Sequence, residues 1–97
     1  MVMSKIVRID ISNIKDKKEL FQKLKEAGLM PREAGENLDA LHDVLTDIGE
    51  ETSLVVYGKD SLIEYCESEE LAEYVETFSR VLDDAAEENP GLTIQWE

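Results

Sequence analysis

The sequence predicts an α/β domain in which a small three-stranded parallel sheet packs against helices. Three β-branched or apolar runs, at residues 6–11, 54–57 and 92–96, are separated by segments with helical periodicity. Strands that alternate with helices need crossover connections, and such connections make a sheet parallel. Ninety-seven residues are enough for one core, so we expect a single domain over residues 1–97, with helices on the faces of its sheet.

The first strand is predicted at residues 6–11, where β-branched side chains roughly alternate with others. Asp16 can cap the helix that follows, with Glu19 as its capping-box partner, and Gly28 ends this helix. The apolar stripe of the helix consists of Leu20, Phe21 and Leu24. Its basic side chains are interpreted as a solvated face: Lys15, Lys17, Lys18, Lys23 and Lys25.

The second strand, at residues 54–57, is an almost continuous apolar run, which is typical of a strand buried on both faces. Residues 61–64, Ser-Leu-Ile-Glu, form a capping box that predicts the start of a short helix. Ser68 is expected to cap the longest helix, which ends at the Asn-Pro-Gly of residues 89–91 before the third strand. The core stripe of this helix is Leu71, Val75, Phe78, Leu82 and Ala85.

Acidic residues dominate the composition, and they lie mostly in the later part of the chain. The net charge at pH 7 is −13. Residues 1–32 hold eight Lys/Arg and four Asp/Glu, a net of +4, whereas residues 33–97 hold two and nineteen, a net of −17. A field of this sign repels nucleic acid and anionic membranes, and it attracts basic proteins or cations. Because high negative charge also aids solubility, charge alone does not establish a partner.

Nothing in the sequence predicts catalysis, a cofactor or a metal site. Cys66 is the single cysteine, so an internal disulfide and a zinc-type Cys/His cluster are both excluded, and it is interpreted as a half-buried small hydrophobe. The chain has one histidine, no glycine-rich phosphate loop and no EF-hand loop. Without a signal-peptide or membrane-length apolar segment at the start, we expect a cytoplasmic protein in a reducing compartment.

Residues 31–48 carry the most informative pattern, a loop that enters a short helix with Asn37 as its N-cap. The apolar stripe of this helix is Leu38, Leu41, Leu45 and Ile48, and a carboxylate stripe lies nearly opposite: Glu36, Asp39, Asp43 and Asp47. Like charges four residues apart repel by roughly 0.2–0.5 kcal/mol per pair, which a cationic partner would relieve. The helix dipole favours Asp39 but not Asp43 or Asp47. From the pattern alone, a solvated face ranks ahead of a binding face.

The order of residues changes that ranking. Residues 35–43, Gly-Glu-Asn-Leu-Asp-Ala-Leu-His-Asp, resemble the signature of the barstar family, and the match continues through Leu45 and Thr46 and includes Pro31. Members of this family are small acidic cytoplasmic inhibitors of secreted bacterial ribonucleases. About one sixth of the chain resembles the family in sequence, and the rest resembles it only in the order of its strands and helices. It implies a small parallel sheet packed with helices, in agreement with the pattern.

The resemblance also implies roles for individual residues. Asp43 corresponds to the carboxylate that enters the phosphate-binding centre of the ribonuclease, and Asp39 to the acidic residue that contacts basic groups at its rim. Gly35 and Asn37 match loop positions that contact the enzyme, with a turn glycine and a helix cap as their structural alternatives. Asp84 matches a further acidic contact on the last helix, with a solvated aspartate as the alternative.

Three positions depart from the prototype of the family. Glu33 and Ala34 stand where it has two tyrosines, and His42 stands where it has a tryptophan. Aromatic side chains commonly carry interface energy by filling pockets. Glu33 could replace stacking with a charge contact, and His42 could serve as a smaller planar contact. The simpler interpretation is a different cognate partner.

The hypothesis favoured by the sequence is a non-enzymatic inhibitor, monomeric when free, that blocks the active site of a small basic ribonuclease with carboxylates that mimic RNA phosphates. The alternative is an acidic adaptor or regulatory module that uses the same scaffold to bind a basic protein that is not a nuclease. Neither hypothesis involves nucleic acid, a membrane or a cofactor. An enzyme is the least favoured class.

Overall fold

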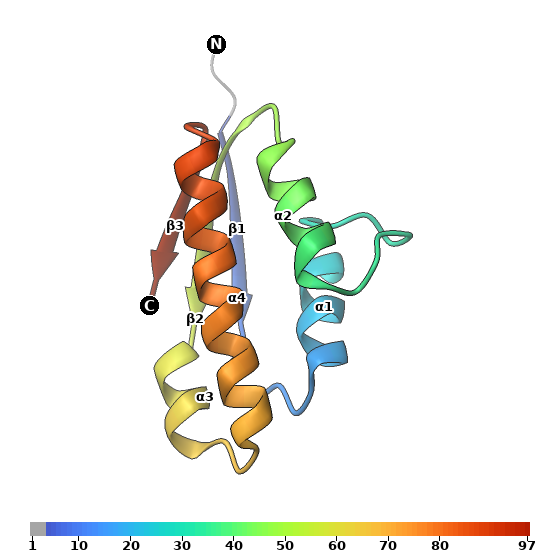
Figure 1. Cartoon of the computed structure of the whole chain (residues 1–97). Helices are drawn as coiled ribbons and strands as arrows, with labels where there is room; N and C mark the ends of the chain where they lie inside the picture. Colours follow the sequence, from blue (N-terminus) through green and yellow to red (C-terminus); the bar gives the residue numbers. More distant parts are fainter. Residues whose placement is uncertain (1–3) are drawn as a thin grey trace.

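The three predicted strands form one parallel sheet in the order β1-β2-β3, so the expected α/β class is confirmed. The computed structural model describes residues 4–97. Four helices connect the strands (Figure 1). In chain order the elements are β1 Ser4–Asp10, α1 Lys17–Glu26, α2 Leu38–Thr46, β2 Glu51–Tyr57, α3 Lys59–Tyr65, α4 Glu69–Glu88 and β3 Leu92–Trp96.

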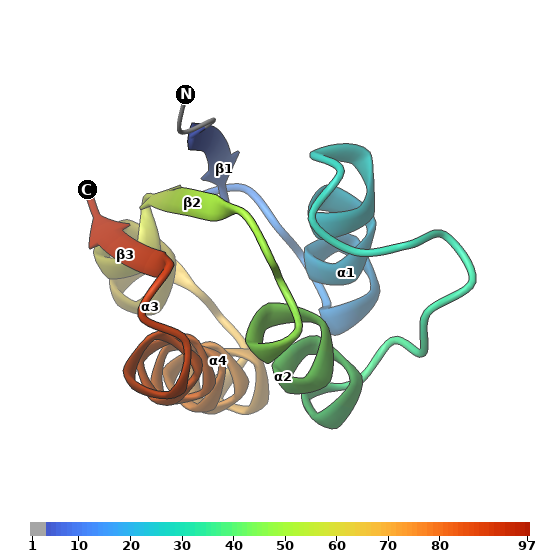
Figure 2. The same cartoon turned by 90° about the horizontal axis from the view of Figure 1, so that it is seen from above.

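The helices cover one side of the sheet, which corrects the expectation of helices on both faces. Figure 2 shows α1, α2 and α4 on the same side, and Figure 1 places α3 beyond the carboxyl end of β2. When strands follow one another in order and every crossover has the same hand, successive helices return to the same side. The buried face of the sheet carries Val7, Ile9, Leu54, Val56 and Leu92.

The opposite face of the sheet, which no helix covers, is nevertheless not uniformly exposed to solvent. Val55 is only 7% exposed, and its neighbours in the adjacent strands are Arg8 and Gln95, whose long side chains can cover it. Ile6, nearer the start of its strand, is 56% exposed. The prediction that the β2 run is buried on both faces is therefore confirmed at Val55.

The predicted helix caps are confirmed with one variation. Asp16 Oδ1 accepts a hydrogen bond from the Glu19 N–H at 2.8 Å, and Ser68 Oγ accepts one from the Leu71 N–H at 3.2 Å. The Glu19 carboxylate reaches back to the N–H of Lys15, at 3.3 Å, and not to that of the cap residue as a capping box requires. Each cap satisfies a backbone donor that the first helical turn leaves free.

The predicted start of α3 is wrong. This helix begins at Lys59, directly after Gly58, so Ser61 lies inside it and does not cap it. Gly58 has a φ of 82°, in the left-handed region that favours glycine, and a Cβ there would lie 2.5 Å from the Ser12 Cβ. The turn after β1 thus packs against the end of β2, and this contact between distant segments sets where the helix starts. No helix among residues 4–97 has the length and apolar character needed to cross a membrane.

Candidate protein-binding face

The orientation of α2 follows from its apolar stripe. Leu41 and Leu45 are fully buried, and Leu38 and Ile48 pack against the core while partly exposed. Burying a leucine side chain contributes about 1.5–3 kcal/mol, so this stripe determines which side of the helix faces the core. The opposite side, with its carboxylates, faces solvent, and the two predicted stripes of this helix are confirmed.

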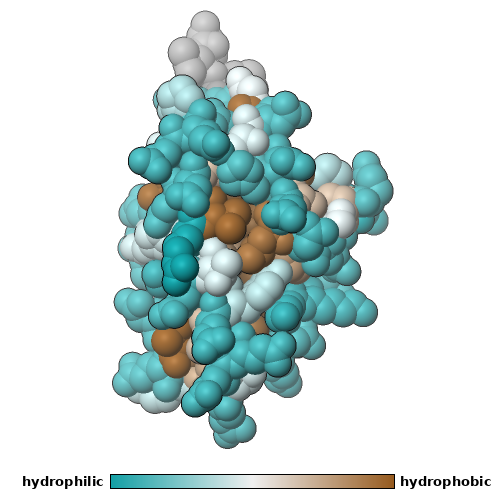
Figure 3. Space-filling model, viewed as in Figure 1, coloured by the Kyte–Doolittle hydropathy of each residue, from teal (hydrophilic) through white to brown (hydrophobic). Residues whose placement is uncertain are grey.

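The carboxylates Asp39, Asp43 and Asp47 are all exposed, and we call these three residues the acidic face. Among residues 4–97, no Lys, Arg or His nitrogen lies within ion-pair distance of any of them. Figure 3 shows hydrophilic side chains over most of this side of the molecule, with one apolar area between α4 and α2 and another near α3. The acidic face therefore presents like charges without a counter-charge from the described part of the chain.

Structural roles account for the contacts that Gly35 and Asn37 make. Asn37 Oδ1 accepts a hydrogen bond from the Ala40 N–H at 2.8 Å, so the predicted N-cap of α2 is confirmed. This bond holds the amide group in place, and a Cβ on Gly35 would lie 2.9 Å from Asn37 Nδ2. A larger residue at position 35 would therefore have to displace the capping amide of Asn37. Both residues remain exposed beside the acidic face.

The other residues that the sequence singles out for partner binding differ in their exposure and contacts. Glu33 is exposed, and Ala34 packs against the core while partly exposed. His42 Nε2 lies 2.6 Å from Glu88 Oε2, which links α2 to the end of α4. Asp84 is exposed one helical turn before Glu88, so the i, i+4 spacing brings it to the side of α4 that faces α2. The structure thus brings Asp84 to the same side of the molecule as the acidic face.

Two residues that support this face were not recognised in the sequence. The sequence pattern at Asn89 predicts only a helix stop, but its Nδ2 donates to the carbonyl oxygens of Leu45 at 2.9 Å and Ile48 at 3.1 Å. The Leu45 carbonyl lies in the last turn of α2 and the Ile48 carbonyl just beyond it, where the helix supplies no donors. Lys25 was interpreted as part of a solvated face, but its ammonium contacts the loop before α2. A partner 44 residues away, as for Asn89, leaves no local signal in the sequence.

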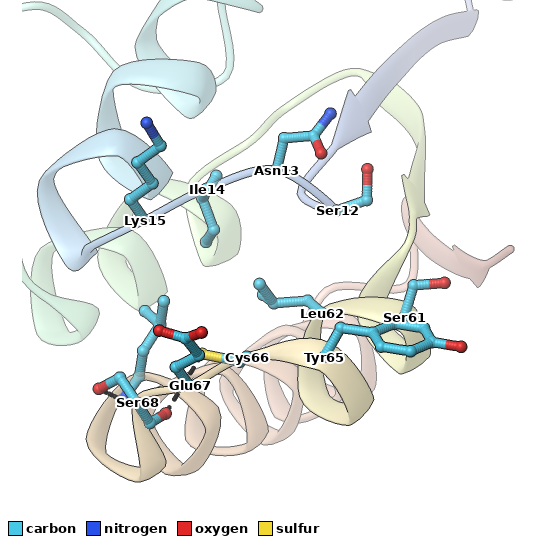
Figure 4. A pocket seen from close by; sticks show the side chains of 11 residues that line it. Ser12, Asn13, Ile14, Lys15, Ser61, Leu62, Tyr65, Cys66, Glu67 and Ser68 are labelled. Carbon is cyan, nitrogen blue, oxygen red and sulfur yellow. Dashed lines mark hydrogen bonds between the residues drawn. The ribbon is translucent and has the colours of Figure 1, made fainter.

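A hollow of about 420 Å³ lies away from the acidic face, between the turn after β1 and the corner where α3 meets α4 (Figure 4). Cys66 lines it, partly exposed as predicted, and its thiol donates to the Ser68 carbonyl oxygen at 3.2 Å. The lining contains hydroxyl groups but no histidine that could activate a nucleophile. Among residues 4–97, no group of three or more His, Cys, Asp and Glu side chains is arranged to hold a metal ion.

Comparison with models of known protein families shows to which family the chain belongs. The family model described as Barstar (barnase inhibitor) matches residues 4–97. This chain belongs to the barstar family. No curated protein gives a significant match to the sequence.

Membership of the barstar family connects the geometry with a function. The family description names inhibition of barnase, which is a ribonuclease. The matched residues include both the loop before α2 and the acidic face, together with α4. The short sequence resemblance at residues 35–43 is thereby extended to essentially the whole chain.

Proposed function

We propose that this protein is a non-enzymatic inhibitor of a small basic bacterial ribonuclease, and that α2 with its preceding loop blocks the active site of that enzyme. The observation that carries the proposal is the acidic face, whose exposed carboxylates lack counter-charges among residues 4–97. Ribonuclease active sites bind phosphate through cationic groups, which form charge-assisted hydrogen bonds with carboxylates. Membership of a family of barnase inhibitors supports this partner class.

Within this proposal the predicted site residues have separate roles. Asp43 is the central carboxylate and Asp39 the contact one turn earlier, because both are exposed on the same side of α2. Asp84 extends the acidic surface from α4. Gly35 and Asn37 shape the edge of the contact through the cap, and Glu33 adds a charge on the exposed loop.

His42 suggests that the cognate enzyme differs from the prototype's. Its ring nitrogen contacts Glu88 within the chain, so the ring is held against α4 at 2.6 Å from that carboxylate. In this arrangement one ring nitrogen is turned towards α4, and an imidazole is smaller than the aromatic anchors that commonly fill pockets at interfaces. This observation also favours the alternative of an acidic adaptor for a basic protein that is not a nuclease.

Isothermal titration calorimetry against a small basic bacterial ribonuclease, at low and at moderate salt, tests the proposal. We expect a one-to-one complex whose association weakens with salt, because a net charge of −13 steers a basic partner over a range that ions screen. A complex with a basic protein that is not a nuclease, and none with any ribonuclease tried, supports the adaptor instead. Both outcomes leave the assignment to the barstar family unchanged.

A further inference from the structure

The loop before α2 is tied to α1 through a single side chain. Lys25 Nζ donates to the Arg32 carbonyl oxygen at 3.1 Å and lies 4.0 Å from Glu36 Oε2. Its side chain is only 17% exposed, which does not fit the solvated lysine that the sequence suggested. One hydrogen bond and one longer ion pair therefore connect this lysine to two points of the loop.

Apart from Lys25, the middle of this loop is supported mainly by Ala34, which packs against the core while partly exposed. The start of the loop is fixed by the buried side chains Leu29 and Met30, and its end by the Asn37 cap. Between them, the backbone hydrogen bond within residues 31–36 runs from the Ala34 N–H to the Pro31 carbonyl oxygen, at 3.1 Å. A segment with so few backbone bonds depends on side-chain contacts for its order.

The contact with Glu36 has a second effect, on charge. Glu36 belongs to the predicted carboxylate stripe, but unlike the three aspartates of the acidic face it has a cation of the same chain beside it. Its own side chain is 41% exposed. Glu36 is therefore paired with Lys25 inside the molecule, whereas the three aspartates of the acidic face remain available to a partner.

We propose that Lys25 is a positioning residue that holds the loop of residues 31–37 in the conformation presented to the partner. A loop that is already ordered loses less conformational freedom on binding, so the complex is tighter. The effect on binding rests on the proposed function, whereas the effect on loop order does not. Lys25 itself faces the loop backbone and need not touch the partner.

The test of loop order uses hydrogen exchange at single amides, measured by NMR on the free protein. In Lys25→Met we expect the Ala34 amide to exchange about tenfold faster, because local opening of a loop governs its protection. The exchange rate of the amide of Leu45, a fully buried residue of α2, should be unchanged. This comparison separates loop opening from general destabilisation. Lys18→Met is the matched control, because Lys18 is an exposed residue of the same helix and the change in net charge is identical.

The test of binding uses the same variants with a small basic bacterial ribonuclease. We expect Kd to rise about tenfold in Lys25→Met but not in Lys18→Met, because ordering the loop then falls to the binding step. Lys25→Arg should restore both Kd and Ala34 exchange, since a guanidinium can also donate to a carbonyl and a carboxylate. A residue that acted only through the net charge would give the same Kd in both Met variants.

The outcomes separate the two proposals. Unchanged Ala34 exchange in Lys25→Met overturns the positioning role, whether or not a ribonuclease binds. Faster exchange with a Kd equal to that of the Lys18 variant overturns it for binding. If the parent protein binds no ribonuclease, the proposed function fails, and the exchange of Ala34 alone decides whether Lys25 orders the loop.

Discussion

α1 and α2 are both short amphipathic helices on the same side of the sheet, but their charges are used differently. On α1, Lys17 lies 3.5 Å from Glu70 and 4.7 Å from the Tyr74 ring, and Lys25 contacts the loop before α2. On α2, the acidic face has no counter-charge among residues 4–97. The acidic face is therefore the part of α2 whose charge is available to a basic partner.

The largest effect is expected from removing the central carboxylate of the acidic face. Asp43→Ala should weaken binding to the ribonuclease by about 2–5 kcal/mol, the cost of truncating one partner of a buried charge pair, in a range drawn partly from barnase–barstar itself. The free energy of unfolding should change by less than about 0.5 kcal/mol, because Asp43 is exposed. Calorimetry and urea unfolding measure the two quantities.

Asp47→Ala is the matched control for that variant. Asp47, the exposed C-cap residue of α2, lies one turn after Asp43 and carries the same charge, but it is beyond the residues proposed to enter the active site. The Asp47→Ala variant should associate slightly more slowly, because less charge steers the partner, and its dissociation rate should be unchanged. Equal losses in the two variants would mean that the acidic face acts only through its total charge.

The next largest effect, on the free energy of unfolding, concerns the contact between the end of α2 and Asn89 at the end of α4. Asn89→Ala leaves the Leu45 and Ile48 carbonyl oxygens without their donor in a part of the molecule where Asn89 is only 9% exposed. We expect the free energy of unfolding to fall by about 1–3 kcal/mol, the cost of a buried polar group left unpaired. Urea unfolding measures it, with the exposed Asn13→Ala as control, and a variant as stable as the parent would refute this supporting role.

A smaller effect is expected from the pair that joins α2 to α4. His42 and Glu88 are 35% and 59% exposed, so their interaction is weakened by solvent. A double-mutant cycle with His42→Gln and Glu88→Gln should give a coupling of about 0–1 kcal/mol in stability. Calorimetry on the same variants should show that Glu88→Gln affects binding far less than Asp43→Ala. A coupling well above this range would make the pair part of the structural core and not a surface contact.

The smallest effect concerns a carboxylate that is satisfied inside the chain. Hydrogen bonds from the Ser12 hydroxyl, at 2.7 Å, and the Ser12 N–H, at 2.9 Å, hold the pKa of Asp10 below its ordinary value, with a smaller contribution from Lys23. Because the folded-state pKa is lowered, the associated stability is present above the unfolded value of about 3.9 and is lost as the pH falls through the folded value.

Ser12→Ala removes the hydroxyl donor and keeps the Cβ that packs against Gly58. We therefore expect the pKa of Asp10 to rise towards its ordinary value, and the variant to be less stable than the parent at pH 7, with a difference that fades below about pH 4. NMR titration of the Asp10 carboxyl and urea unfolding at several pH values check both statements. An unshifted titration would contradict the role of the hydroxyl.

Much of this arrangement is local and could be predicted from the sequence. The caps at Asp16, Asn37 and Ser68 and the two stripes of α2 depend on residues three or four apart, so the sequence contains them directly. The acidic face followed from the same periodicity. Its roles in binding came only through the family signature, because a wet face and a binding face share one pattern.

The features that were missed depend on contacts between distant segments. The start of α3 is set by the approach of Ser12 to Gly58, and the end of α2 by Asn89. The open face of the sheet follows from the strand order, which the sequence does not display. Lys25 could not be distinguished from its exposed neighbours, since burial of a lysine stem is decided by what packs over it.

The most direct test of the central claim is the cleavage of RNA by a small basic bacterial ribonuclease, titrated with the parent protein and with Asp43→Ala. We expect activity to fall in proportion to added parent protein and to vanish at one equivalent, because Asp43 occupies the phosphate-binding site and Asp39 contacts its rim. The Asp43 variant at the same concentration should leave most of the activity. Undiminished cleavage at an excess of parent protein, with every such ribonuclease tried, would contradict the claim that these carboxylates take the place of RNA phosphates.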